Sequence, residues 1–261
     1  MGELVIKPSL RRLRASALAA VYLFVGAAAL NVANADIIVP SGGSVALGGS
    51  NDDLGFTDVT VAGTLLLQNG SLRNVRNLTI APGGSVVAGS GAITLSGNWD
   101  NAGSFSAGSG AVHFVDAPAC AGSTISGSST FATLSLVSTC GKLYRFAVGS
   151  NQTIGTLFTV GGTAALPLRL ESTGAAQSAF INLTGQQLIN DLAVTDLRAT
   201  GVALAPTLTN QNPTGVAIGW FGLTEASYAV PVTGGFTLGA ICLALLLFGI
   251  GAQRRTARLP A

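Results

Sequence analysis

The feature that most constrains this chain is a series of short apolar pairs at spacing two, separated by turns rich in Gly, Ser, Asn and Pro. Alternation of this kind is typical of β-strands that bury one face. From Ile37 to the start of the C-terminal tail, no window shows the 3.6-residue apolar stripe of an amphipathic helix. We therefore expect an all-β body. The clearest pairs are Val59/Val61, Leu65/Leu67, Leu78/Ile80, Ile93/Leu95, Val112/Phe114, Leu134/Leu136 and Phe158/Val160.

The pairs recur along the chain with a loose period. Comparable pairs start at positions 59, 78, 93, 112, 134 and 158, so that successive starts differ by 19, 15, 19, 22 and 24. A loose repeat of about 20 residues indicates a solenoid in which each coil supplies strands and stacks on its neighbour. A sandwich of two sheets with several short strands is the alternative.

Composition excludes several classes of function. Only 9% of the residues are charged, against about 25% in an average soluble domain. One His (His113) and three Cys are too few for His-rich metal sites, haem ligation or a Cys-cluster zinc site, so we expect no metal and no cofactor. Between Asp36 and Val230 there are six basic residues against ten acidic ones, a net charge of −4, and no basic cluster that would bind nucleic acid.

The N-terminus has the order of a secretory signal peptide. Four cations precede an uncharged apolar run over residues 17–30, which ends in Ala33-Asn34-Ala35 before Asp36. We expect residues 1–35 to form the signal helix and to be removed between Ala35 and Asp36. An uncleaved anchor and an N-terminal helix of the fold are the alternatives. The cations are Lys7, Arg11, Arg12 and Arg14.

Residues 97–114 have a distinctive sequence pattern: Gly-x-Trp-x-Asn-x-Gly-x-Phe-x-x-Gly-x-Gly-x-Val-x-Phe. This stretch resembles bacterial secreted, repeat-rich surface proteins, and the likeness covers roughly residues 55–221. The resemblance implies that the body, residues 36–229, is a right-handed parallel β-helix or a related β-solenoid.

Cys120 and Cys140 are the two cysteines of the body. In an exported chain a disulfide is the default for such a pair. Their separation along the sequence equals about one coil, which would bring corresponding positions of adjacent coils together. Two unpaired thiols are the alternative.

A few single residues are candidates for chemistry. His113 lies between Val112 and Phe114, so we expect its side chain on the wetter face, without a metal or catalytic role. Trp99 and Trp220 are either sugar-stacking platforms or, as we favour, aromatic residues of a small glycine-rich core.

Two functions fit the body. We favour an exported structural or adhesion protein of the cell envelope, not an enzyme and with no catalytic residues, which contacts extracellular polysaccharide or matrix through a Ser/Thr/Asn face. The alternative is a polysaccharide lyase or hydrolase on the same scaffold, which would need three or more carboxylates converging in one groove. The closest-spaced candidates are Asp52-Asp53, which reads as a turn, and the pair Asp191 and Asp196, and the basic candidates are Lys142 and Arg145 beside Tyr144.

The C-terminal segment, residues 230–261, has three ordered parts. A short motif over residues 230–236 is followed by an uncharged apolar stretch over residues 236–252, whose 17 residues are at the lower limit for crossing a membrane as a helix. The basic residues Arg254, Arg255 and Arg258 then stop the span, and by the positive-inside preference they stay in the cytoplasm. The body would then lie on the other side of the membrane, where the signal peptide also sends it.

This tail resembles the bacterial C-terminal sorting signals of the PEP-CTERM class, especially the variant with the motif I-P-T-L-S-E-W-G. Val230 is a conservative match to its first position, Pro231 matches the second, and Phe236 replaces the Trp. Gly234-Gly235 before a span and arginines is also similar to the GlyGly-CTERM type. The resemblance implies a membrane-embedded, exosortase-like transpeptidase or protease that removes the helix after transport. A plain one-pass anchor is the alternative.

Overall fold

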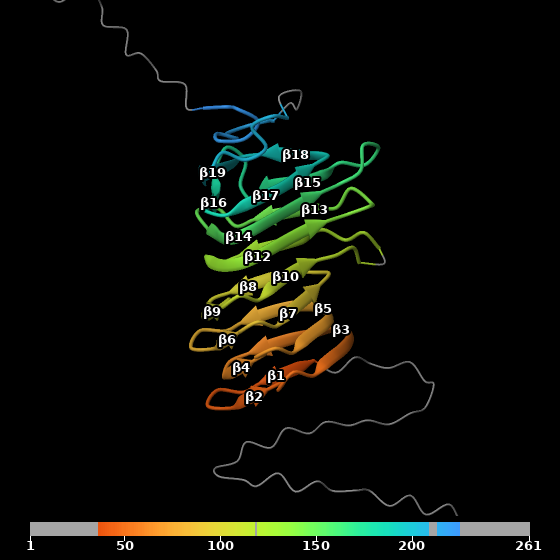
Figure 1. Cartoon of the computed structure of the whole chain (residues 1–261), viewed down its shortest axis with the longest axis vertical. Coiled ribbons are helices and arrows are strands. Elements are labelled where there is room, and N and C mark those ends of the chain that lie inside the picture. The colour runs from red at the N-terminus through yellow and green to blue at the C-terminus, as the bar shows by residue number, and fades with distance from the viewer. Residues whose placement is uncertain (1–35, 118, 209–212, 225–261) are drawn as a thin grey trace, which may run out of the picture. The chain divides into compact units, whose positions relative to one another are not determined.

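The computed structural model describes residues 36–117, 119–208 and 213–224. They form a parallel β-solenoid of about eight turns, in which each turn of the chain stacks on the one before it (Figure 1). The described residues contain no helix, and therefore none that is long and apolar enough to cross a membrane. The all-β solenoid expected from the apolar pairs is confirmed.

The described residues contain nineteen strands. They are β1 (Ile37–Val39), β2 (Ser44–Ala46), β3 (Asn51–Val61), β4 (Thr64–Leu66), β5 (Ser71–Ile80), β6 (Ser85–Val87), β7 (Ala92–Leu95), β8 (Trp99–Asn101), β9 (Ser104–Ser106), β10 (Ala111–Phe114), β11 (Ser123–Ser126), β12 (Ser129–Val137), β13 (Leu143–Phe146), β14 (Asn151–Gly161), β15 (Leu168–Ser172), β16 (Ala179–Leu183), β17 (Gln186–Asn190), β18 (Leu192–Thr195) and β19 (Leu197–Gly201).

The strands form three series, which we call the first, second and third faces. The first face consists of β1, residues 59–61 of β3, residues 78–80 of β5, β8, β11, β13, β15 and β18. The second consists of β2, β4, β6 and β9, followed by residues 129–131 of β12, residues 151–154 of β14, β16 and β19. The third consists of residues 51–53 of β3, residues 71–75 of β5, β7, β10, residues 133–137 of β12, residues 157–161 of β14 and β17.

All pairings between these strands are parallel. A two-sheet sandwich is built from antiparallel sheets, so that alternative is excluded. The coils differ in length, because Trp99 and its partner Ile125 are farther apart along the chain than Val59 and its partner Leu78. The extra residues of the longer coil lie in the loop between β10 and β11, which contains Cys120.

The core is a stack of inward side chains, because alternate residues of every strand face the inside. Leu78, Trp99 and Phe146 on the first face, and Leu134 and Phe158 on the third, are all fully buried. The corners between strands are tight. At Gly84, for example, the backbone N–H donates to the carbonyl of Ala81 (2.8 Å), and a Cβ there would overlap the Val61 carbonyl of the preceding coil.

The two ends of the solenoid are finished differently. One inward row on the third face runs from Asp52 through apolar residues to Gln187, by way of Leu72, Ile93, Val112, Leu134 and Phe158. At the C-terminal end, the Gln187 side chain accepts from the backbone N–H of Ala205 (2.7 Å) and donates to the carbonyl of Ala203 (2.8 Å), which fixes the segment after β19. The first coil has a carboxylate at this inward position.

Candidate functional site

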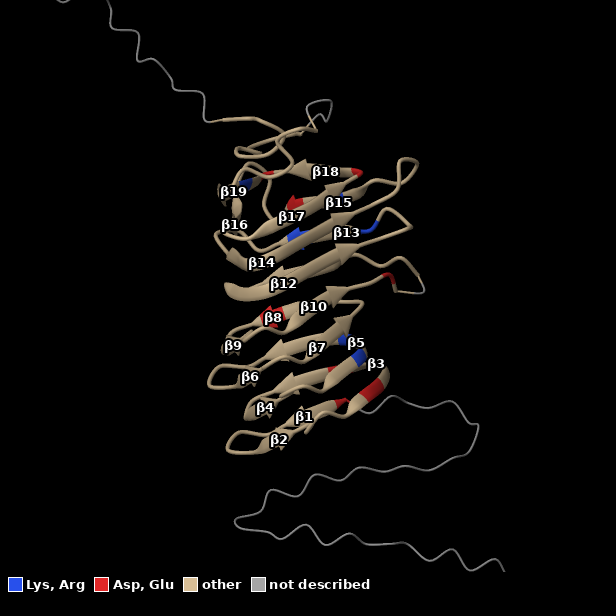
Figure 2. Cartoon of the chain, viewed as in Figure 1, with Lys and Arg blue, Asp and Glu red and all other residues tan. Residues whose placement is uncertain are grey.

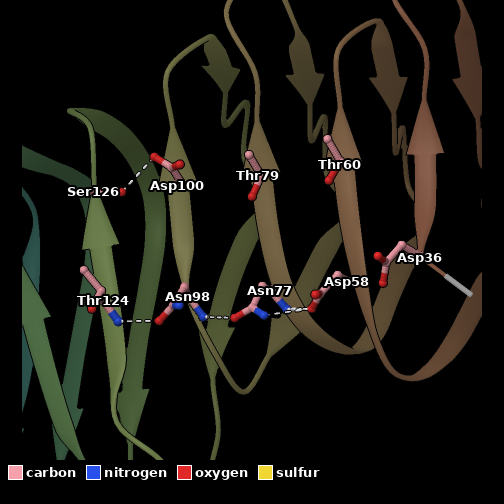
Figure 3. A pocket seen from close by; sticks show the side chains of 9 residues that line it. All are labelled: Asp36, Asp58, Thr60, Asn77, Thr79, Asn98, Asp100, Thr124 and Ser126. Carbon is pink, nitrogen blue, oxygen red and sulfur yellow. Dashed lines mark hydrogen bonds between the residues drawn. The ribbon is translucent and has the colours of Figure 1, made fainter. Parts of the chain in front are cut away.

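A shallow groove of about 510 Å³ lies on the outside of the first face. It crosses five adjacent strands, β1, β3, β5, β8 and β11, and its lining is polar (Figure 3). The lining residues are Asp36, Asp58, Thr60, Asn77, Thr79, Asn98, Asp100, Thr124 and Ser126.

These side chains face outward because each one flanks an inward apolar residue. Val59, Leu78 and Trp99 occupy successive inward positions, so the residues on either side of each must point to solvent. The parallel register then aligns the outward residues into two rows along the solenoid. Four short triplets supply both rows: residues 58–60, 77–79, 98–100 and 124–126.

The first row is a hydrogen-bonded ladder (Figure 3). The Asp58 carboxylate accepts from the Asn77 amide (2.8 Å) and from the Asn77 backbone N–H (3.1 Å). The Asn77 side-chain oxygen accepts from the backbone N–H of Asn98 (2.7 Å), and the Asn98 oxygen accepts from that of Thr124 (2.8 Å). Each side chain thus satisfies the next coil's backbone, which holds the row in place.

Arg76 controls the charge at the N-terminal part of the groove. Its guanidinium donates two hydrogen bonds to the Asp58 carboxylate (both 2.7 Å) and lies 3.9 Å from Asp36. Hydrogen bonding to Arg76 is the main cause that lowers the pKa of Asp58 below its usual value. Asp58 is therefore held ionised, which suits an ion-paired positioning residue and not a general acid.

The second row presents hydroxyls and one carboxylate. Thr60, Thr79, Asp100 and Ser126 stand at the same register on successive strands. The Ser126 hydroxyl donates to the Asp100 carboxylate (2.8 Å; Figure 3). This row offers both donors and acceptors to a ligand in the groove.

The ladder row continues beyond the groove. Arg145 pairs in register with Thr124 and lies 3.8 Å from the carboxylate of Glu171, and the Thr195 and Thr214 hydroxyls are hydrogen-bonded (2.7 Å). At a strand spacing of about 4.8 Å, nine positions extend about 38 Å along the solenoid. We call this row the polar stripe; it consists of Asp36, Asp58, Asn77, Asn98, Thr124, Arg145, Glu171, Thr195 and Thr214.

The middle of the third face contrasts with the first face in its charge. The strands β7, β10 and β12 contain no Lys, Arg, Asp or Glu, and Figure 2 shows their ribbons without a charged residue. His113 faces outward on β10 and is half-buried, and burial lowers the pKa of its imidazole. Its outward orientation agrees with the sequence prediction.

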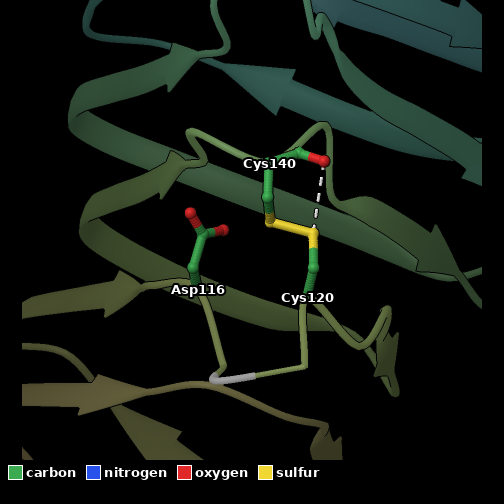
Figure 4. Close-up of side chains that lie close together, drawn as sticks. All are labelled: Asp116, Cys120 and Cys140. Carbon is green, nitrogen blue, oxygen red and sulfur yellow. Dashed lines mark hydrogen bonds between the residues drawn. A yellow bond between two sulfur atoms is a disulfide. The ribbon is translucent and has the colours of Figure 1, made fainter.

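Cys120 and Cys140 form a disulfide, as the sequence predicts, with their Cα atoms 6.1 Å apart (Figure 4). Asp116 lies beside the two sulfurs, and the three ligand atoms are within 4.8 Å of one another. The S–S bond removes the thiolates that a metal would need, and the Asp116 carboxylate instead accepts from the backbone N–H and hydroxyl of Thr139 (2.8 and 3.0 Å). A disulfide indicates an oxidising compartment outside the cytoplasm.

Lys142 lies two residues after Cys140 and is unusual for a lysine, because its side chain points into the core and is only 1% exposed. Its ammonium donates to the carbonyls of Ser96 (2.6 Å) and Val115 (2.8 Å) on two earlier coils, and lies 5.0 Å from the centre of the Tyr144 ring. Burial lowers the pKa of Lys142 to about 8, and the nearby Asp116 opposes this shift. Lys142 therefore ties three coils together.

The structure does not bring the other candidates into one site. Trp99 and Trp220 are fully buried, so the prediction that they belong to the core is confirmed. Asp191 and Asp196 flank opposite ends of β18, and Asp196 is 5% exposed and accepts from the backbone N–H groups of Ala176 (2.9 Å) and Val216 (2.8 Å). Asp196 is thus a structural acceptor.

Asp52 and Asp53 lie within β3 and pair in register with β5, so the interpretation of this site as a turn is wrong. Asp53 accepts from the Asn74 amide and the Gly55 N–H. Ala33, Ala35 and the whole C-terminal segment from Val230 to Arg258 lie outside the described residues. Of the export and sorting residues, only Asp36 is described, at the start of the first coil.

The sequence interpretation missed the groove. Asp58, Asn77, Asn98 and Asp100 stand at the outward positions next to apolar residues that it did identify. The repeated triplets at residues 58–60, 77–79 and 98–100 were a usable signal, since their spacing matches the coils.

Comparison of the chain with protein-family models, curated proteins and solved structures finds no match.

Proposed function

We propose that this protein is an exported structural or adhesion protein of the cell envelope, and that the polar stripe and its groove contact an extended extracellular polymer. The observation that carries the proposal is the stripe itself, in which polar groups repeat at one strand spacing over nine coil positions. A periodic row of donors and acceptors suits a periodic ligand such as a polysaccharide. The ladder bonds keep the row rigid, so binding would order few side chains.

Retention of the protein on extracellular matrix isolated from its host tests the proposal. The double variant Thr60→Ala/Thr79→Ala removes two outward hydroxyls of the groove and should weaken retention several-fold, by roughly 1 kcal/mol for each lost hydrogen bond. Thr94→Ala, an outward threonine of the third face, is the matched control. Equal retention of the groove variant and the control would contradict the proposal.

Export and sorting are part of the same proposal and have their own tests. N-terminal sequencing of the envelope-bound protein should show Asp36 as the first residue. Recovery of an intact N-terminus that begins at Met1 would contradict the signal-peptide prediction. Removal of the C-terminal helix by an exosortase-like enzyme should leave a mass that ends within residues 230–235. Retention of Arg254 and Ala261 would leave the alternative of a plain membrane anchor.

A second candidate function is a polysaccharide lyase or hydrolase. It is favoured by the three carboxylates Asp36, Asp58 and Asp100 in one groove. Against it, Asp58 is paired with Arg76. Asp58 and Asp100 also stand in different rows, two strands and two residues apart, about 12 Å between Cα positions, and the Asp100 carboxylate accepts from the Ser126 hydroxyl. We expect no turnover of a polysaccharide panel, whereas cleavage abolished by Asp100→Asn would establish the enzyme.

A further inference from the structure

The second face is interrupted between its fourth and fifth strands. The ladder β2-β4-β6-β9 ends at β9, and the next segment of this face, residues 129–131 of β12, pairs with β14 only. Among the described strands, β9 therefore keeps one open edge in the middle of the solenoid. The first and third faces are continuous at the same level, through β8–β11 and β10–β12.

Aromatic side chains account for the interruption. Along this inward row Val45, Leu65 and Val86 are followed by Phe105, and Phe131 comes next across the gap. The ring centres of Phe105 and Phe131 are 5.5 Å apart. The ring centre of Trp99 lies 4.9 Å from that of Phe105 and 5.2 Å from that of Phe131. Three large rings at one level of a narrow core need more room than the aliphatic levels below, so the two coils separate on this face.

The interruption opens into a notch of about 470 Å³. Phe105 and Phe131 contribute apolar surface, and Ser106, Thr130 and Thr156 contribute hydroxyls. The rest of the lining has little or no side chain. Phe105 is half-buried and can be reached from the notch, whereas Phe131 is only 1% exposed and backs it from the core. None of the nine lining residues is charged; they are Phe105, Ser106, Ala107, Gly108, Thr130, Phe131, Ala132, Gly155 and Thr156.

This chemistry restricts the occupant. An inserted β-strand would hold its neighbours about 9.6 Å apart, twice the strand spacing, whereas Phe105 and Phe131 remain in contact across the notch. A charged ligand would find no counter-charge in the lining. A neutral sugar ring has one face of C–H groups, which suits the negative face of an aromatic ring, and a rim of hydroxyls, which suits Ser106, Thr130 and Thr156.

We propose that the notch between β9 and β12 binds a ring of a neutral polysaccharide, with Phe105 as the stacking platform. The inference rests on the proposed function and deepens it, because it names the class of polymer and adds a second contact on another face. Trp99 packs edge-on against Phe105 and donates from its indole N–H to the Ser129 hydroxyl (3.0 Å). It positions the platform and reports on it through its fluorescence.

The test is a titration of the full-length protein, in mild detergent, with neutral hexaoses of β-1,4-glucose, α-1,4-glucose and β-1,4-mannose, followed by tryptophan emission and calorimetry. We expect saturable binding of at least one hexaose. Phe105→Leu keeps an apolar core side chain but removes the aromatic face, and should weaken binding about ten-fold. Val86→Ala, at the equivalent position one coil earlier, should bind as the parent does.

Thr130→Val provides a second variant, because Thr130 is exposed and the change removes a hydroxyl without loss of volume. It should weaken binding several-fold even if Phe105→Leu fails to fold. Absence of binding to all three hexaoses would overturn the proposal that the notch binds a neutral sugar. Binding of a hexauronate with the same affinity as the neutral hexaoses would overturn it too. Binding lost in Thr60→Ala/Thr79→Ala but kept in Thr130→Val would assign the sugar to the groove instead. Hexaose binding at the notch without retention on matrix would leave the notch standing and reject the proposed function.

Discussion

Replacement of Lys142 by Met should abolish a rise in stability that we expect of the parent protein between pH 8 and pH 10. The ammonium is buried against two backbone carbonyls and an aromatic ring, and the pKa of Lys142 is lowered by burial to about 8. In the unfolded chain the same group has its ordinary pKa of about 10.4. Between these two values the unfolded state binds more protons than the folded state, so the free energy of unfolding increases with pH.

The size of the rise follows from the two pKa values. Each pH unit over which only the unfolded state is protonated adds about 1.4 kcal/mol. Partial titration at both limits reduces the sum, which leaves an expected gain of about 2 kcal/mol from pH 8 to pH 10.

Two other groups set the limits of this window. Burial lowers the pKa of His113. The contribution of His113 to the free energy of unfolding therefore rises with pH only up to the ordinary pKa of histidine, near 6.5, and is complete below pH 8. Burial raises the pKa of Tyr144, so the unfolded tyrosine loses its proton first and stability falls above about pH 10. Lys142 is thus the group with a shifted pKa that titrates between them.

The assay is urea unfolding of residues 36–230, followed by tryptophan fluorescence at half-unit steps of pH. This segment contains Cys120 and Cys140 but not Cys242, so no free thiol can exchange with the disulfide at high pH. Lys142→Met leaves two carbonyls without their donor, at a cost of about 1 to 3 kcal/mol each, but that cost does not vary with pH. A parent whose stability is flat over the window, or a variant that keeps the slope, would refute the reasoning.

Three further outcomes are expected. Non-reducing peptide mapping should recover Cys120 joined to Cys140, and reduction should lower the stability by roughly 3 kcal/mol; quantitative alkylation of Cys120 without reductant would be the contrary result. Asn98→Ala removes one rung of the ladder and should cost about 1 kcal/mol in urea unfolding, whereas an unchanged midpoint would show that the rung contributes nothing. Asp52→Leu continues the apolar row of Leu72 to the open end of the first coil, and light scattering should detect end-to-end association that the parent lacks; a variant that stays monomeric would show that other features guard this end.

The sequence predicted the strands and the stacking better than the assignment of strands to faces. The steps 59 to 78, 93 to 112, 112 to 134 and 134 to 158 are each a register pair of adjacent coils. The step from 78 to 93 is not, since Leu78 belongs to the first face and Ile93 to the third, where it pairs with Leu72. Alternation shows that a residue faces inward, but every face of a solenoid has the same alternation.

The groove and the burial of Lys142 could not be predicted from the alternation of apolar residues, for a physical reason. Asp58 and Asp100 come to line one groove only through the register of three strands, β3, β5 and β8, and the apolar pairs alone do not show which strands share a face. Lys142 follows Gly141 in the connection between β12 and β13, where a lysine is expected to be solvated. Its inward direction depends on carbonyls of two earlier coils, those of Ser96 and Val115. Cys120 and Cys140 were accessible from sequence because one coil separates them.

Because the coils stack in parallel register, the length of the solenoid can change only in steps of one whole coil. Duplication of one whole coil would insert another layer of inward and outward side chains in phase with the existing ones, and would extend the polar stripe by one strand spacing of about 4.8 Å. An insertion of one residue within a strand would instead turn its inward side chains to solvent. Length variation is therefore confined to whole coils and to corner loops such as the one that contains Cys120, and the polar stripe can be lengthened or shortened without rebuilding the core.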